Sequence, residues 1–300
     1  MSGSIANRLS LLAAAMGNDA RQVPRLARLA GFKGLLFDVW SSMLSIPDLS
    51  ASGRRDFLGM LATDAQQLVA LRIDLGPNGL SIGADVDKQI ARLNQAIQSS
   101  AELQSPLLCV DLGPLPQPQV ALKPSPTVKP QDAGLIIIPT LQATPTVAQS
   151  PPPDPAAVSQ VSSALVEIGQ LADRYSMTLA LSTSLASFAA LQQAIVSANC
   201  PWFGIDLDTV AILRDAWTQD EIFSALGPLI RHVRARDAII GADHRTKPAL
   251  IGRGSINWRE LLAALDDSGY RGFFTIDPLE LPDRAPAAKA GAKHLRELLK

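Results

Sequence analysis

This sequence has little cysteine, little histidine and no excess of either charge. Its 300 residues include two cysteines and three histidines, and 27 basic residues offset 28 acidic ones. Cys109 lies inside an apolar run and Cys200 precedes another, which excludes a disulfide scaffold and favours buried free thiols in a reducing cytoplasm. The formal charge of −1 leaves no global footprint for a nucleic acid or an anionic membrane, so neither partner is expected.

Long apolar runs are also absent. No run reaches the roughly 18 residues that a membrane-spanning helix needs. A short apolar run follows Arg8 in the opening residues, MSGSIANRLSLLAAAMG. A signal peptide is one interpretation of this run, but its charged segment is thin and the same residues suit a first β-strand. The chain does have apolar content, 47% of its residues, which is enough for one large core.

Short apolar runs alternate with helical patterns, which is typical of a parallel sheet with helical crossovers. The clearest helical pattern places Val86, Ile90, Leu93 and Ile97 on one face after a cap at Asp85. The expected strands lie at residues 8–14, 33–40, 66–76, 106–113, 177–183, 202–208, 230–237 and 272–278. Eight strand-and-helix units predict an α/β fold, the (β/α)8 TIM barrel, whose sites lie at the carboxyl ends of the strands.

Residues 114–155 interrupt this alternation, because they hold 12 of the 22 prolines and four charged residues. Proline at this density blocks helix interiors and sheet ladders, so we expect an irregular insertion after the fourth strand, with one short strand at GLIIIP. A linker between two domains is the alternative. The alternation resumes with a helix at residues 156–175, which favours a single domain over residues 1–300 and an excursion over the barrel mouth.

Polar residues at the ends of the expected strands are the candidates for chemistry, since the opposite rim mostly serves stability. They are Asp38, Asp74, Asp111, Ser182, Thr183, Asp206, Asp208, His232, Arg234, Arg236 and Asp277. An acid that ends a strand is commonly a helix cap or a loop ion-pair partner, and that alternative stands for each acid here. Their recurrence on several strands favours a shared site.

Strand alternation puts His232, Arg234 and Arg236 on the inward face of their strand. Cations inside a barrel mouth need carboxylate partners or an anionic ligand, because unpaired buried charge is costly. Asp208 and Asp277, on the two neighbouring strands, are the expected partners.

The loop after this strand is rich in cations and glycine, in the stretch DHRTKPALIGRGS. Here His244, Arg245 and Arg253 lie near Gly252 and Gly254. Barrels bind phosphate on the loops after their seventh and eighth strands through glycine amides and fixed cations, so the loop is a candidate anion site. A tight turn within a solvated basic loop explains the same residues equally well.

Several motifs resemble, in order and spacing, those of the sugar phosphate isomerase/epimerase family with the xylose isomerase-like TIM barrel. They are GIDLDTVAIL, HVRARD, IGRGSINWRELLAALDDSGYRGFFTIDP and, near the start, LARLAGFKGLLFD. The resemblance implies a small carbohydrate ligand, phosphorylated or not. It also implies one divalent cation, Mn²⁺, Mg²⁺ or Zn²⁺, held by Glu, Asp, His and Glu, whose two glutamates move a proton on opposite faces of a ketose.

Carried over by position, this implied ligand set is incomplete. The first glutamate corresponds to Ser182 or Thr183, the aspartate to Asp208, the histidine to Arg234 and the last glutamate to Asp277. A guanidinium removes a donor lone pair and adds a charge that, at ~5 Å and an effective dielectric of about 20, repels a divalent cation by roughly 6–7 kcal/mol. We therefore expect no cofactor, or a weakly held metal on Asp208 and Asp277.

Two other metal arrangements are considered. His232 is an alternative ligand if its strand is shifted in register, although it lies one pleat deeper than Arg234. A multi-zinc DNA-repair endonuclease from the same barrel superfamily is excluded, because three histidines, one of them in the last helix, cannot build its cluster.

Two hypotheses on function remain. One is a diverged isomerase, epimerase or lyase, with Asp208 and Asp277 as acid and base and Arg234 in the electrostatic role of the cation. The other is a non-catalytic barrel that binds a sugar or a protein. Contacts to the ligand are expected from Asp38, Asp111, Ser182, His232, Arg236, His244, Arg245 and Arg253. A homo-oligomer is compatible with both hypotheses.

Overall fold

The computed structural model describes residues 5–81, 83–117, 154–183, 187–215, 217–241 and 245–299. Most of the expected insertion at residues 114–155, including its short strand at GLIIIP, lies outside the described residues, and so does His244. Of the helices within the described ranges, none is long and apolar enough to cross a membrane.

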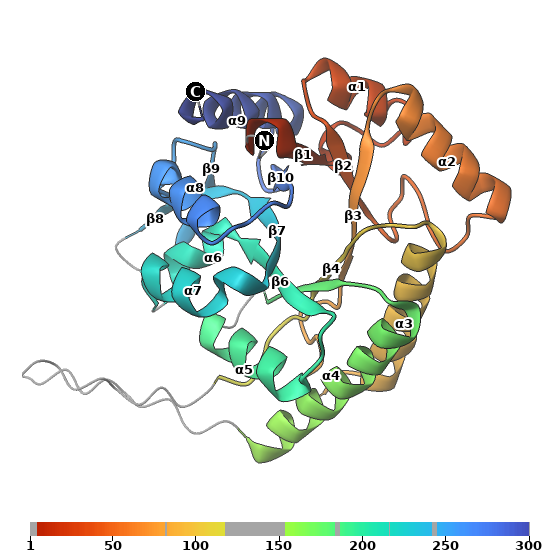
Figure 1. Cartoon of the computed structure of the whole chain (residues 1–300), viewed down its shortest axis with the longest axis vertical. Coiled ribbons are helices and arrows are strands. Elements are labelled where there is room, and N and C mark those ends of the chain that lie inside the picture. The colour runs from red at the N-terminus through yellow and green to blue at the C-terminus, as the bar shows by residue number, and fades with distance from the viewer. Residues whose placement is uncertain are drawn as a thin grey trace, which may run out of the picture.

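Eight parallel strands close into one barrel, which Figure 1 shows as a ring with helices around it. In chain order they are β1 (Leu9–Leu12), β2 (Gly34–Asp38), β3 (Gln67–Asp74), β4 (Leu108–Asp111), β5 (Leu179–Ser182), β6 (Phe203–Asp208), β7 (Ile230–Ala235) and β10 (Phe274–Ile276). Each pairs with the next, and β10 closes the ring against β1, where Leu9 lies opposite Phe274. The barrel predicted from the sequence is confirmed.

The helices lie outside the ring of strands (Figure 1). They are α1 (Val23–Leu29), α2 (Ala51–Thr63), α3 (Val86–Glu102), α4 (Pro155–Tyr175), α5 (Phe188–Ala198), α6 (Thr209–Arg214), α7 (Gln219–Leu226), α8 (Trp258–Asp267) and α9 (Arg284–Leu298), with short 3-10 turns η1 (Ile5–Arg8), η2 (Ala13–Ala15) and η3 (Gly227–Leu229). The predicted cap at Asp85 is present, because its Oδ1 accepts a hydrogen bond from the amide of Lys88 at 3.1 Å.

A β-hairpin follows β7, where the sequence indicated only a loop. β8 (Asp237–Ile240) pairs antiparallel with β9 (Thr246–Ala249). β7 ends at Ala235 and Arg236 separates it from β8, so the predicted strand at residues 230–237 contains the whole of β7 and the first residue of β8. Periodicity missed this boundary because alternation does not mark where a chain leaves a barrel.

Strand alternation divides the buried residues into two layers. Outward-facing residues such as Leu11, Leu71 and Ile205 belong to the main core, which also includes the helices. A second, smaller cluster includes Leu12, Leu36, Ala70, Cys109 and Ala180 on the inward face of five strands. Polar and charged side chains at or near the carboxyl ends of the barrel strands form the candidate site.

Candidate functional site

The carboxyl ends of the strands bring most of the predicted polar residues to one face of the barrel. Asp38 ends β2, Asp111 ends β4, Ser182 ends β5 and Asp208 ends β6, while Asp277 directly follows β10. We call this face the barrel mouth. Asp74 also ends its strand, but its exposed carboxylate accepts a hydrogen bond from the amide of Gly76 at 2.6 Å and shapes a turn.

Arg234 lies among the carboxylates of the mouth. It is the register neighbour of Asp208 across β6 and β7, and its Nη2 lies 3.4 Å from Asp208 Oδ2. Burial alone would lower the pKa of Arg234, but the nearby carboxylates, Asp208 and Asp206 foremost, raise it above its ordinary value. Arg234 therefore stays charged, and its buried Nε has no hydrogen-bond partner among the described residues.

Asp208 is the most heavily paired acid of the mouth. Arg236 donates to it twice, from Nε to Oδ1 at 3.1 Å and from Nη2 to Oδ2, and Arg214 Nη2 lies 3.9 Å away. Its Oδ1 also accepts from the amide of Val210, which caps α6. Burial alone would raise the pKa of Asp208, but Arg234 and Arg236 outweigh it and hold this pKa below its ordinary value. This carboxylate is therefore a weak base.

Arg72, which sequence reasoning missed, connects two other acids of the mouth. Its Nε lies 2.8 Å from Asp38 Oδ1, and its Nη1 lies 3.3 Å from Asp277 Oδ2. Asp277 was expected to pair with the cations of β7, but within the described part of the chain it forms its ion pair with this arginine on β3. The sequence did indicate where the Arg72 side chain lies, because alternation in QLVALRID puts it on the same strand face as Ala70 and Asp74.

The pKa of Asp111 is shifted in the opposite direction to those of Asp206 and Asp208. Its Oδ1 accepts from the amide of Gly113 at 3.0 Å, and the side chain is half-buried. Burial raises the pKa of Asp111, with Asp74 and Asp206 acting in the same direction, and the Gly113 amide and Arg234 offset this rise only in part. A carboxyl group with a raised pKa is a better proton acceptor than one whose pKa is lowered.

His232 lies one pleat below Arg234, as the register predicts, and is only 1% exposed. Its Nδ1 is 2.7 Å from Asp206 Oδ1 and its Nε2 is 2.6 Å from Thr275 Oγ1. Burial alone would raise the pKa of Asp206, but His232 and Arg234 outweigh it and lower this pKa. His232 was predicted to contact a ligand at the mouth, yet both of its ring nitrogens face other side chains of the barrel interior.

The glycine-rich turn that was a candidate anion site already holds a carboxylate from this chain. Asp237 Oδ2 accepts from the amides of Gly252 at 2.9 Å and Gly254 at 3.2 Å, and from the indole of Trp258 at 2.9 Å. Two amides that would bind a phosphate are thus already engaged. Arg253 is exposed on this turn, and Arg245 is exposed beside β9.

The residues at the mouth do not fit the divalent cation that the resemblance implies. Arg234 occupies the position of the histidine ligand, and its guanidinium points to Asp208, the one ligand that is kept. Ser182 replaces an acid and lines a small cleft with Thr183 and Asp208 at the ends of β5 and β6. A hydroxyl and a guanidinium cannot supply the charge and lone pairs of glutamate and histidine.

Comparisons with known proteins agree with this fold. Residues 24–298 match the family model of the xylose isomerase-like TIM barrel. Similar solved structures include a xylose isomerase domain protein from Planctomyces limnophilus, at 15% identity and a TM-score of 0.69, covering 97% of this chain and 96% of that one. An L-ribulose 3-epimerase is 17% identical, with a TM-score of 0.67 and coverage of 97% and 94%.

A xylose isomerase-like TIM barrel protein from Mycobacterium smegmatis, in complex with magnesium, is 15% identical, with a TM-score of 0.68 and coverage of 99% and 98%. At such identities these structures show a shared fold alone. No curated protein matches the chain significantly. The family model spans nearly the whole chain, which therefore belongs to the xylose isomerase-like TIM barrel family.

Proposed function

We propose that this chain binds a small sugar or sugar acid at the barrel mouth without a metal ion, with Arg234 in the electrostatic position of the cation. The observation that carries the proposal is the buried guanidinium of Arg234 among the carboxylates of Asp208, Asp206, Asp277 and Asp111. A fixed guanidinium polarises a carbonyl or holds a carboxylate oxygen by donating hydrogen bonds. The similarity to an L-ribulose 3-epimerase supports a sugar as the ligand class.

The mouth offers both kinds of hydrogen-bonding group that a sugar needs. Arg234 Nε is buried without a partner among the described residues, so a ligand oxygen would satisfy it. Carboxylates accept hydrogen bonds from hydroxyl groups, and Asp38 and Asp277 are held in place for this by Arg72. The glycine turn is occupied by Asp237, which favours an unphosphorylated ligand over a sugar phosphate.

The proposed chemistry is proton transfer beside a sugar carbonyl, as in an isomerase or epimerase. Asp111 is favoured as the group that moves the proton, because burial raises its pKa. Asp277 remains a second candidate. Asp208 was expected to act as an acid or base. We assign it instead the role of balancing the charges of Arg234 and Arg236, because these two arginines hold it as an anion.

A non-catalytic sugar-binding barrel is the second candidate. It is favoured by the loss of the first family acid at Ser182, which leaves fewer groups to move protons. The first experiment separates the two candidates. The chain is incubated in D₂O with chelator and a panel of ketoses, aldoses and sugar acids, and NMR follows binding and deuterium uptake at carbon. Uptake supports the enzyme, and binding without uptake supports the second candidate. If the chain shows no binding and no deuterium uptake with any member of the panel, both candidate functions are overturned.

We also propose a single domain with the proline-rich segment as an excursion. β4 pairs directly with β5 on the far side of that segment, with Cys109 opposite Ala180, so the barrel does not need it to close. Replacing residues 118–153 by a glycine–serine linker of about twenty residues should leave one cooperative unfolding transition. Two separate transitions would contradict the proposal.

The free cysteines Cys109 and Cys200 support a reducing compartment such as the cytoplasm.

A further inference from the structure

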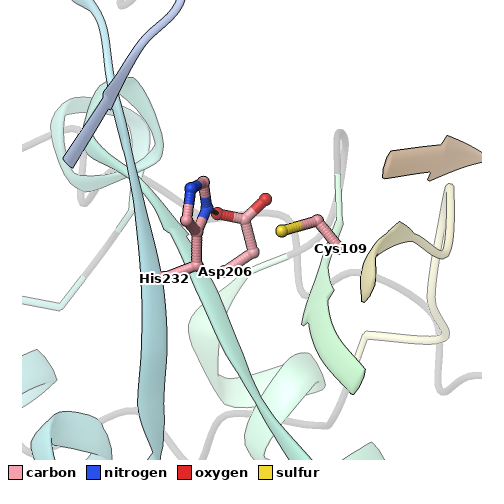
Figure 2. Close-up of side chains that lie close together, drawn as sticks. All are labelled: Cys109, Asp206 and His232. Carbon is pink, nitrogen blue, oxygen red and sulfur yellow. Dashed lines mark hydrogen bonds and ion pairs between the residues drawn. The ribbon is translucent and has the colours of Figure 1, made fainter. Parts of the chain in front are cut away.

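Three different metal-ligand side chains meet in the barrel interior, one pleat below the mouth. Cys109 of β4, Asp206 of β6 and His232 of β7 each offer one ligand atom, and these atoms all lie within 4.8 Å of one another. All three are almost fully buried, at 1%, 3% and 1% exposure. Figure 2 shows the carboxylate of Asp206 between the imidazole and the thiol. Cys109 takes no part in the ion pairs described above for the barrel mouth.

The barrel places these side chains together for a simple reason. Asp206 and His232 are register neighbours on adjacent strands. Cys109 lies one strand further away, opposite Ala180 of β5, and the short alanine leaves the thiol beside Asp206. Burial raises the pKa of the Cys109 thiol, and Asp206 acts in the same direction, so the thiol is neutral when no cation is bound.

We propose that Cys109, Asp206 and His232 form a site for one thiophilic divalent cation, with Zn²⁺ as the expected ion. Thiolate, carboxylate and imidazole are the donors that zinc binds in proteins, whereas Mg²⁺ and Mn²⁺ prefer oxygen. The site is distinct from the family's cation position, which Arg234 occupies. It stands independently of the proposed sugar binding.

The histidine is already oriented for this role by its second nitrogen. Nε2 of His232 faces Thr275 Oγ1 at 2.6 Å, and Thr275 Oγ1 lies 2.8 Å from Ser10 Oγ. A metal-binding histidine commonly donates its other ring N–H to such a partner, which fixes the tautomer and the ring orientation. Donation from Nε2 to Thr275 leaves Nδ1, on the side of Asp206 and Cys109, as the ligand atom.

Binding exchanges the thiol proton of Cys109 for the ion. The imidazole keeps its hydrogen on Nε2, donated to Thr275, so the lone pair of Nδ1 is available to the metal. Bonds form from sulfur, nitrogen and oxygen to the metal, and the thiol hydrogen leaves to solvent as a proton. The Cys109 thiolate and the Asp206 carboxylate carry two negative charges that offset the divalent cation, so the bound site presents no net positive charge to Arg234 above it.

Cobalt(II) is the probe, because a thiolate ligand gives a sulfur-to-cobalt charge-transfer band that oxygen and nitrogen ligands do not give. The purified full chain is stripped with chelator, incubated with CoCl₂ to equilibrium, and freed of unbound ion. We expect about one cobalt per chain with this band, and displacement of the band by ZnCl₂. Mn²⁺ should not displace it. A spectrum without the thiolate band overturns the proposal.

Variants assign the band to the three residues. Cys109→Ala and His232→Asn should each abolish it, and Cys200→Ser, which changes the other cysteine, should retain it. Thr275→Val should weaken cobalt binding about tenfold, because the contact that orients His232 is lost while all three ligands remain. Thermal melting of each metal-free variant checks that the variant folds. Where a variant does not fold, the cobalt spectrum of the wild type still tests whether a thiolate binds the metal. A band that survives in Cys109→Ala, or disappears in Cys200→Ser, contradicts the assignment.

Discussion

Arg234 and Asp208 lie side by side at the ends of β7 and β6, with Nη2 of the arginine 3.4 Å from Oδ2 of the aspartate. The pair occupies two positions at which the family resemblance implies metal ligands. A positive side chain in one of them replaces the charge of a cation with a charge that belongs to the protein. The site is thus organised by ion pairs.

Restoring the two lost ligands should restore binding of a hard cation. In the double variant Ser182→Glu, Arg234→His, an acid and an imidazole join Asp208 and Asp277, and the repelling guanidinium is gone. We expect MnCl₂ to raise the melting temperature of this variant and leave that of the wild type unchanged. Ser182→Glu alone is the matched control and should show no Mn²⁺ effect, because Arg234 remains. Equal Mn²⁺ responses in both variants would show that the arginine does not exclude the metal.

Removing the charge of Arg234 should cost stability. Arg234→Met keeps most of the side-chain volume but leaves Asp208 with one fewer partner at a buried position. Breaking a buried ion pair costs roughly 3–5 kcal/mol in the free energy of unfolding, and the remaining pair with Arg236 places this variant at the lower end. Urea unfolding measures the loss. Arg253→Met, at an exposed arginine, should change the free energy of unfolding by less than about 0.5 kcal/mol.

Asp208 should make the folded protein less stable in acid. Its pKa in the folded state is lowered, so the unfolded chain binds more protons in the window below the ordinary aspartate pKa of about 3.9. The contribution of Asp208 is present above that value and is lost as the pH falls toward the lowered pKa. Asp208→Asn should therefore flatten the acid limb of stability against pH, measured by urea unfolding.

Asp111 should show the opposite sign in the same measurement. Its pKa in the folded state is raised, so its contribution is present below the ordinary aspartate pKa and is lost as the pH rises through the raised one. Asp111→Asn should match the wild type in acid and gain relative to it as the pH rises. A difference between the two proteins that does not vary with pH would contradict this assignment.

Asp237 should stabilise the turn after the hairpin. Its Oδ2 accepts from Gly252, Gly254 and Trp258, and its Oδ1 accepts from the amides of Ala238 and Ile256. An asparagine has one oxygen, so it turns N–H groups toward one of these two sets of donors. Hydrogen bonds to charged groups contribute about 1.5–3 kcal/mol each, so Asp237→Asn should lower the free energy of unfolding by roughly 3 kcal/mol. Asp267→Asn, at an exposed acid of α8, should leave it nearly unchanged. Equal losses in the two variants would show that Asp237 is not specifically required.

The hydrogen bonds of the Asp237 carboxylate also predict how the protein responds to inorganic phosphate. Because Asp237 occupies the amides of Gly252 and Gly254, inorganic phosphate should not raise the melting temperature of the wild type. Asp237→Ser, which removes the carboxylate from the turn, should gain a phosphate response if these amides become free. A phosphate response in the wild type that is lost on changing Arg253 would restore the turn as an anion site.

The sequence by itself determined the barrel and which polar residues stand near the ends of most strands, because both depend on local patterns. Apolar runs with a period of two and helical faces with a period of 3.6 count out eight units, and the structure has them. The same alternation placed Arg234 and His232 inward and predicted Arg234 beside Asp208. The extent of β7 was misjudged, since alternation continues into a hairpin that has left the barrel.

Only the tertiary structure decided how Arg72 and Asp277 pair. Arg72 and Asp277 are 205 residues apart, and barrel closure brings their side chains to 3.3 Å. The occupation of the glycine turn by Asp237 and the meeting of Cys109 with Asp206 and His232 likewise depend on contacts between distant segments. Alternation states which face of a strand a side chain lies on. The partner of that side chain across the barrel depends on strand register and side-chain length, and no local sequence pattern determines this pairing.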